Sequence, residues 1–136
     1  MLKRTRIFEL DLINDSNFDA TIASMINFQQ EYLPDGDKLP LLFTPNVDDV
    51  VKLNDKKYST LAAILKKCFY IIPDCQPIIW VSKMLGKDKA LQRRLPGSEL
   101  FPLLWKELIR HNKRIMVIAP NEQVGELLKK EYANMV

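Results

Sequence analysis

The stretch FYIIPDC, residues 69–75, decides the fold that this sequence predicts. Its first four residues form a short apolar run, which is typical of a buried strand, and Pro73 then favours an extended chain leading away from that strand. Asp74 is therefore expected where a buried strand gives way to a loop. That position indicates a function, because open α/β sheets bind ligands at the carboxyl ends of their strands.

Outward from this stretch, strand and helix patterns alternate along the chain. We expect strands at residues 6–13, 39–43, 69–72 and 114–119, the first of them at an edge of the sheet. We expect helices over residues 18–29, 47–53, 58–65 and 78–85, and two more that begin after Gly97-Ser98 and after Pro120-Asn121. The first helix is expected to be capped from residues 14–17, and residues 34–37 are expected to form a turn.

This alternation predicts an α/β domain with a Rossmann-like, mostly parallel sheet. Right-handed crossovers would place helices on both faces of that sheet. A chain of 136 residues has the length of one domain, so residues 1–136 are expected to share a core. The chain stops after a helix without a closing strand, and we therefore expect a truncated form of the fold.

Composition excludes several classes of protein. Apolar residues make up 47% of the chain and charged residues 27%, as in ordinary globular proteins. No apolar run approaches the roughly 20 residues of a membrane span, and no secretory signal is present, so we expect a cytoplasmic protein. Cys68 and Cys75 are expected to be reduced thiols without metal spacing. His111, the only histidine, is expected at a helix C-terminus, so we predict neither a metal site nor a cofactor.

A basic segment follows the predicted helix at 78–85. Five cationic residues fall within twelve positions and are opposed only by Asp88; they are Lys83, Lys87, Lys89, Arg93 and Arg94. The segment is either a solvated loop or a surface that meets phosphates or anionic lipid headgroups. Nucleic acid is a third alternative, but the net charge of +3 is small and no aromatic residues are interleaved with the cations, so we expect no nucleic-acid partner.

Three polar positions could carry chemistry. Asp74 is either a turn aspartate or a general base that takes a proton from a sugar hydroxyl. Thr44 and Asn46 are either a strand-end hydroxyl and a helix cap, with Asp49 completing a capping box, or a hydrogen-bonding shelf at a helix N-terminus. Arg94 is either a surface arginine or a group that stabilises a departing pyrophosphate without a metal.

The motifs Thr44-x-Asn46, Pro73-Asp74 and Arg94-x-x-Gly97-Ser98 occur in an order and at a spacing that resemble a known family. The chain is similar to the WecG/TagA/CpsF glycosyltransferases, glycosyltransferase family 26. The resemblance covers nearly the whole chain, most firmly from Leu41 onward, and corresponds to the N-terminal part of the family domain.

The resemblance implies a hexosyltransferase that moves an N-acetylmannosamine-type sugar from a UDP-sugar donor. The acceptor would be a polyprenyl-diphosphate-linked sugar, N-acetylglucosamine on undecaprenyl diphosphate, and the configuration would invert without a metal. Family members build teichoic-acid linkage units and other cell-surface polysaccharides, which implies peripheral membrane contact at the inner face of the plasma membrane. By the same resemblance, Asp74 matches the catalytic base, Thr44 and Asn46 match active-site polar residues, and Arg94 matches a substrate-binding arginine.

The chain also departs from the family pattern. Cys75 stands where the family usually has glycine, and Ala119-Pro120 stands where it often has two glycines. The family's second half, with a Pro-Lys-Gln-Glu-like segment and a membrane-associating part, has no counterpart here. These departures favour an alternative, a non-catalytic relative that acts as a binding or interaction domain. An uncovered sheet edge would leave self-association into a homo-oligomer open.

Overall fold

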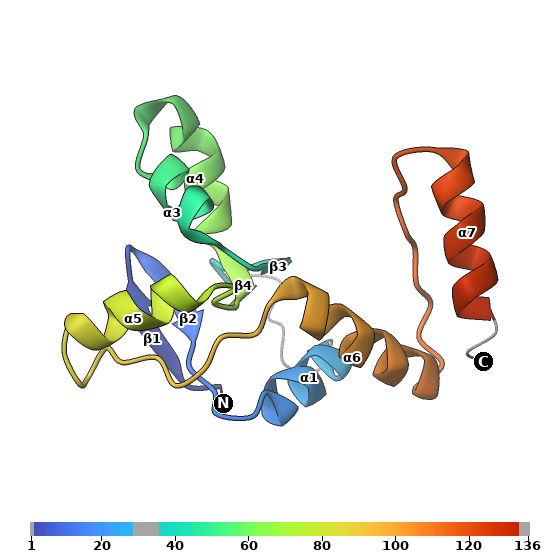
Figure 1. The fold of residues 1–136 in the computed structure, drawn as a ribbon, viewed down its shortest axis with the longest axis horizontal. Helices are drawn as coiled ribbons and strands as arrows, with labels where there is room; N and C mark the ends of the chain where they lie inside the picture. The colour runs from blue at the N-terminus through green and yellow to red at the C-terminus, as the bar shows by residue number, and fades with distance from the viewer. Residues whose placement is uncertain (1, 29–35, 134–136) are drawn as a thin grey trace.

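The computed structural model describes residues 2–28 and 36–133, which form two small sheets and several helices (Figure 1). An antiparallel hairpin consists of β1 (Arg4–Ile7) and β2 (Leu10–Ile13), and a parallel pair consists of β3 (Leu39–Phe43) and β4 (Cys68–Ile71). The helices are α1 (Asp19–Ile26), α3 (Val47–Leu53), α4 (Ser59–Leu65), α5 (Gln76–Met84), α6 (Gly97–Arg110) and α7 (Glu122–Ala133), with a short 3-10 helix η1 (Lys56–Tyr58). The α/β class is confirmed. The parallel sheet has two strands in the described residues, so the predicted Rossmann-like sheet is not seen there.

The N-terminal segment is a hairpin, so the prediction of one edge strand over residues 6–13 is wrong. Phe8 and Glu9 form the turn with φ values of 52° and 60°. Two consecutive left-handed residues match the twist of a tight hairpin, although Asn and Gly are the residues usually found there. The sequence therefore does not predict the turn, because neither residue is of a type that usually forms turns.

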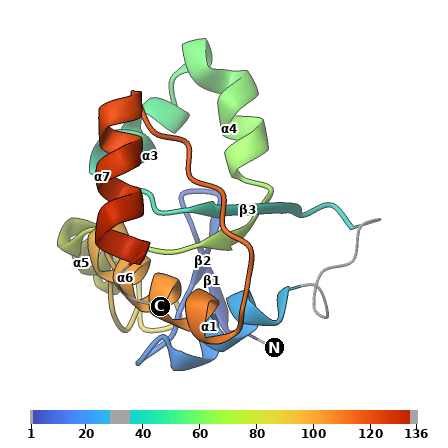
Figure 2. The same cartoon turned by 90° about the vertical axis from the view of Figure 1, so that its right-hand side faces the viewer.

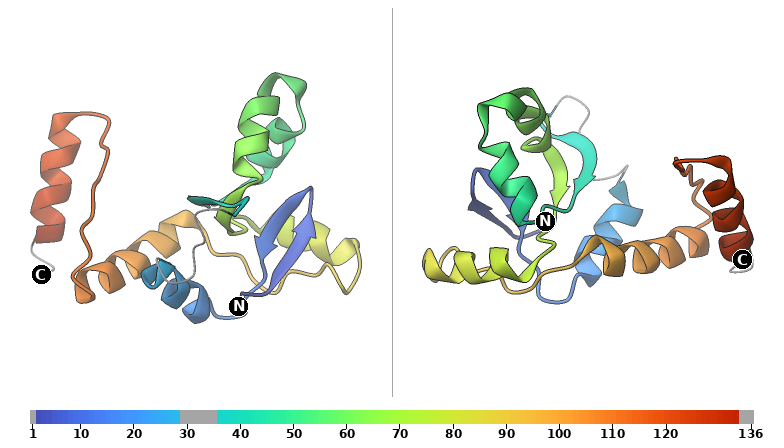
Figure 3. Two further views of the ribbon diagram at one scale, coloured as in Figure 1. Left: turned by 180° about the vertical axis from the view of Figure 1, so that it is seen from behind. Right: turned by 45° about the horizontal axis from the view of Figure 1, so that its top comes forward.

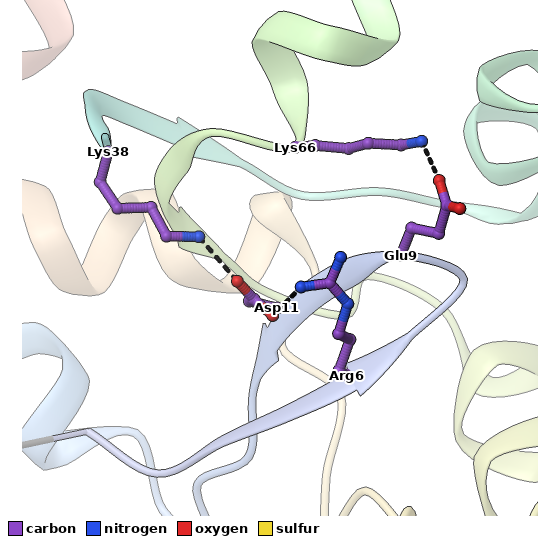
Figure 4. A network of polar contacts seen from close by, with 5 residues as sticks. All are labelled: Arg6, Glu9, Asp11, Lys38 and Lys66. Carbon is purple, nitrogen blue, oxygen red and sulfur yellow. Dashed lines mark hydrogen bonds and ion pairs between the residues drawn. The ribbon is translucent and has the colours of Figure 1, made fainter.

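Ion pairs fasten this hairpin to the parallel pair (Figure 4). Lys38, just before β3, donates to Asp11 on β2 at 2.8 Å, and Arg6 lies 3.7 Å from the same carboxylate. Lys66, between α4 and β4, pairs with Glu9 in the turn. The hydrogen bond from Lys38 holds the pKa of Asp11 below its ordinary value, against an opposing effect of burial. The hairpin is thus held to the second sheet at two points.

The core lies on both sides of β4. Ile71 belongs to a cluster with side chains from the hairpin, α3, α4 and α5, among them Leu12, Leu53, Ala62 and Ile79. Tyr70 and Ile72 belong to a second cluster with residues around α1 and α6, namely Ile13, Phe18, Leu95 and Leu100. Neighbouring residues of a strand point to opposite faces, which explains how one short strand serves both clusters.

Most of the predicted helices and strands are confirmed within a few residues. The capping box is present, with Asn46 and Asp49 exchanging two hydrogen bonds of 3.0 Å at the start of α3. The formal cap position of α1 is Phe18, with φ of 58° and no side-chain bond, but the Asn17 side chain accepts the N–H of Asp19 at 3.4 Å, so the predicted capping from residues 14–17 is confirmed only in part. Asn14 instead bonds Thr5 and residues 90 and 92, which joins the hairpin to the loop before α6. Gln29 and residues 34–35 of the predicted turn lie outside the described residues.

The predicted strand at residues 114–119 is also wrong. This segment is extended but has no strand partner in the described part of the chain, and Met116 and Ile118 are 85% and 88% exposed. Figures 1 and 3 show that the segment and α7 stand apart from the two sheets, and Figure 2 shows the segment running alongside α7. We call residues 113–133 the C-terminal arm. An apolar, β-branched pattern favours a strand only where a sheet edge receives it.

Candidate active site

The carboxyl ends of β3 and β4 and the chain just before α6 meet at one edge of the parallel pair. Three backbone hydrogen bonds join them. The Asp74 N–H donates to the Pro45 carbonyl at 3.2 Å, and the Leu95 N–H donates to the Pro73 carbonyl at 2.8 Å. The Ile72 N–H donates to the Phe43 carbonyl at 2.9 Å. Segments separated by some 20 to 50 positions in the sequence therefore form a single backbone platform.

Asp74 is half-buried on this platform. Its Oδ1 accepts a hydrogen bond of 2.8 Å from the N–H of Gly97, the first residue of α6. The cap residue Pro96 makes no side-chain bond to the helix, so the carboxylate supplies the missing acceptor from another segment. A carboxylate suits this place because a helix N-terminus carries partial positive charge. No hydrogen bond from the described residues engages Oδ2, which therefore remains available to a ligand.

Arg94 adjoins the same loop. Its Nη1 donates to the main-chain carbonyl of Asp74 at 3.4 Å, a long and weak bond, and it makes no ion pair with that carboxylate. The guanidinium also lines a polar cavity of about 280 Å³ with residues of α5, the following loop and α6: Gln76, Ile79, Lys83, Gln92, Arg93 and Glu99. Arg94 thus lies between the Asp74 loop and a cavity that carries three cationic side chains.

Thr44 follows the last residue of β3 and is half-buried. A Cβ atom placed on Gly97 would lie 3.4 Å from the Thr44 hydroxyl oxygen, so the helix N-terminus passes directly beside this hydroxyl. Asp74 bonds the N–H of the same glycine. The Thr44 hydroxyl and the Asp74 carboxylate consequently lie around one residue, although they are thirty positions apart.

Asn46 lies at the same edge but is exposed, and its Oδ1 accepts the N–H of Asp49 in the capping box. The structure therefore gives this residue a structural task, whereas its contact with a substrate stays a prediction. Cys75 has φ of −121° and ψ of 154°, an extended conformation that any residue adopts. The cysteine in place of the family's usual glycine thus introduces no strain.

The remaining candidates are the two cysteines and the histidine. Cys68 and Cys75 are free thiols, as predicted, and burial raises the pKa of the Cys68 thiol.

His111 directly follows α6 and lies 3.7 Å from Glu107. These two residues line a larger groove of about 460 Å³ between α1 and α6, which contains none of the four predicted site residues. Polar side chains also line this groove, among them Asp19, Arg110 and Asn27, but none of them belongs to the motifs that pointed to the chemistry.

Two further findings concern the described residues as a whole. Among the described residues, no three His, Cys, Asp or Glu side chains gather where they could hold a metal ion. No helix in the described ranges is long and apolar enough to cross a membrane.

Residues 11–136 match the Glycosyl transferase WecG/TagA/CpsF family. The chain belongs to this family. No curated protein and no solved structure matches it.

Membership of the WecG/TagA/CpsF family makes the protein a glycosyltransferase by descent, with a sugar donor and an acceptor as its general substrates. Gly97 belongs to the backbone platform through its N–H, which donates to Asp74, and the sequence did not predict this role. The pairing of Gly97 with Ser98 marked a helix start, but only the fold brings that start to Asp74. The basic segment indicated Lys83 and Arg93 as candidate anion-binding residues, but it did not predict that they line the same cavity.

Proposed function

We propose that this protein is an inverting, metal-independent hexosyltransferase of cell-surface polysaccharide synthesis. It transfers an N-acetylmannosamine-type sugar from a UDP donor to N-acetylglucosamine on undecaprenyl diphosphate. It works in the cytoplasm as a peripheral protein at the inner face of the plasma membrane. The observation that carries this proposal is the Asp74 carboxylate, which is anchored by one oxygen to Gly97 and lies in the loop that Arg94 contacts.

The Asp74 carboxylate acts as the general base. It accepts the proton of the acceptor hydroxyl while that oxygen forms a bond to the anomeric carbon of the donor sugar. The bond from the anomeric carbon to the diphosphate breaks, and its electron pair leaves with the diphosphate. Attack from the face opposite the leaving group inverts the configuration. The Gly97 N–H fixes the carboxylate in position during this step, which is what a catalytic base requires.

The remaining site residues bind the substrates. Arg94 neutralises the charge that develops on the departing diphosphate, because a guanidinium can form two parallel hydrogen bonds to phosphate oxygens. Thr44 donates or accepts at a sugar hydroxyl near Asp74. The amide nitrogen of Asn46 donates to a substrate oxygen, a role that the capping box allows because it uses only the amide oxygen.

A transfer assay tests the proposal. The full chain is incubated with UDP-N-acetylmannosamine and a short-chain polyprenyl diphosphate carrying N-acetylglucosamine, in the presence of a chelator. The proposal predicts formation of the disaccharide lipid at an undiminished rate with chelator. Absence of transfer from folded protein, or transfer that stops when metals are removed, would contradict it.

A second candidate is a non-catalytic binding domain. It is favoured by the C-terminal arm, whose segment 114–119 stands away from the parallel pair, and by Ala119-Pro120, where a backbone donor is missing. Titration calorimetry separates the two functions. Binding of UDP favours the enzyme, whereas binding of the lipid diphosphate without binding of UDP favours the second candidate.

A further inference from the structure

Helix α5 presents an apolar face to solvent. Its inner face buries Ile78, Ile79 and Ser82, which are at most 2% exposed. Large exposed apolar side chains lie opposite that face, Trp80 (58% exposed) and Met84 (85%), and along one flank at the end of the helix, Val81 (36%) and Leu85 (48%); we call these four residues the α5 ridge. Residues 80 and 84 are four positions apart and so lie one above the other on the helix. Neighbouring exposed apolar side chains on one helix form a candidate interaction surface, which the charges around them help to interpret.

Cationic side chains border the α5 ridge. Lys83 lies on the same helix, Lys87 and Lys89 lie in the loop that follows, and Arg93 lies at the end of that loop. All four are exposed, and none is engaged in an ion pair in the described part of the chain. Asp88 is the single carboxylate in this stretch. The border of the ridge therefore attracts anions.

The polar cavity beside Arg94 opens on the same flank of α5. Gln76 and Lys83, which bound one side of the ridge, line this cavity together with Arg93 and Arg94. Three cations face one carboxylate, Glu99, so the cavity favours a negatively charged group. Arginine and lysine together are the side chains that most commonly bind phosphate in proteins.

We propose that the α5 ridge and its basic border dock on an anionic lipid bilayer, with a headgroup phosphate entering the cavity at Lys83, Arg93 and Arg94. Tryptophan and long apolar side chains insert at the boundary between headgroups and acyl chains, and lysines beside them meet the anionic surface. Each lysine near such a surface strengthens binding about fivefold. Charge complementarity selects a bilayer over a second copy of this chain, whose own ridge carries the same positive border.

The proposal deepens the proposed function on which it rests, because Arg94 lines the cavity and also donates to the main-chain carbonyl of Asp74. Figures 1 and 3 show α5 and its loop at the opposite end of the molecule from α7, so docking through the ridge leaves the arm away from the bilayer.

Vesicle co-sedimentation of the full chain, without any sugar donor, tests the docking surface. One set of vesicles contains phosphatidylcholine alone and the other contains phosphatidylcholine mixed with phosphatidylglycerol. We expect binding to the mixed vesicles, weak binding to phosphatidylcholine alone, and loss of binding at high salt. Met84→Gln should weaken binding about tenfold, because one apolar side chain no longer leaves water.

Matched controls locate the effect. Met116 in the arm is also 85% exposed, so Met116→Gln changes the same surface chemistry at another place and should leave binding unchanged. Lys83→Glu should weaken binding more than Lys56→Glu, although both change the net charge equally. All of these positions are exposed, and the fold should tolerate each change.

Several outcomes would overturn the proposal: no binding to mixed vesicles, equal binding to both vesicle types, or equal losses with Met84→Gln and Met116→Gln. Light scattering without vesicles tests whether a second copy of this chain occupies the ridge instead. A dimer that Met84→Gln converts to a monomer would assign the ridge to that second copy. The two proposals can fail separately. Vesicle binding without sugar transfer would refute the proposed enzyme activity and support the docking surface. Sugar transfer by a protein that does not bind vesicles would support the enzyme activity and refute the docking surface.

Discussion

At the scale of the residue, Asp74 combines a structural and a proposed chemical task. Its place after a buried strand was predictable, because the apolar run and Pro73 are local signals. Its bond to Gly97 was not, because the two residues are 23 positions apart and meet only through the packing of α6. Thr44 and Arg94 were predicted from the same kind of local signal, and the structure brings both next to the segments that hold Asp74.

The bond between Asp74 and Gly97 can be measured through stability. Asp74→Ala removes the one side chain that bonds the N-terminus of α6 within the described part of the chain, and we expect it to lower the free energy of unfolding by about 1 kcal/mol. Asp74→Asn retains an oxygen acceptor and should cost less than half as much. Urea denaturation of both variants and of the unaltered protein checks this, and an Asp74→Ala variant as stable as the unaltered protein would mean that the bond contributes nothing.

At the scale of the element, local signals were sufficient for α3 and α4, because the capping residues Asn46 and Asp49 and the helical spacing of the apolar residues act within a few positions. They were insufficient for the β1–β2 hairpin, whose turn residues Phe8 and Glu9 adopt left-handed conformations without being turn formers. The hairpin is determined by its buried side chains and by the ion pairs of Figure 4.

The capping box allows the structural role of Asn46 and its proposed substrate-binding role to be tested separately. Asn46→Ala should lower stability by about 1 kcal/mol, because the Asp49 N–H loses its acceptor. Asn46→Asp keeps that acceptor and should restore stability while removing the amide nitrogen proposed to reach the substrate. Restored stability with reduced sugar transfer would assign the amide to binding. Full transfer by the folded Asn46→Asp variant would leave the residue as a cap alone.

The ion pair between Lys38 and Asp11 predicts a pH dependence. Because Lys38 lowers the pKa of Asp11 in the folded protein, the stabilisation is complete above the unfolded value, near pH 4, and is lost as the pH falls through the lower folded value. Asp11→Asn should therefore lower stability at neutral pH and flatten the decline in acid. Thermal melts from pH 7 to about pH 3 check this. Lys38→Met should give the same flattening, and an unchanged slope in both variants would contradict the account.

At the scale of the whole molecule, the predicted third parallel strand at residues 114–119 is the main failure of sequence reasoning. The apolar pattern is present in the sequence, but a strand forms only when it pairs with a neighbouring strand. Whether such a strand lies beside it depends on the assembled fold. The exposed Met116 and Ile118 show that no described segment covers it. A homo-oligomer in which a second copy receives this segment remains a prediction.

Limited proteolysis examines the arm. Because residues 113–118 are exposed and extended, trypsin should cleave first at Lys113 or Arg114. The two clusters around β4 contain no arm residue, so the N-terminal fragment should keep cooperative unfolding at nearly the same temperature. Protection of this site at high protein concentration, with a doubled mass in light scattering, would indicate that the segment pairs with another copy.

The assembled site is tested most directly by sugar transfer with Asp74→Asn, compared with Asp48→Asn at an exposed position on α3. Both changes remove one carboxylate, and only the first removes the proposed base while keeping an oxygen for Gly97. The account predicts that Asp74→Asn folds, binds UDP and loses at least about a hundredfold in turnover, whereas Asp48→Asn transfers normally. Turnover by Asp74→Asn at the rate of the unaltered protein would contradict it.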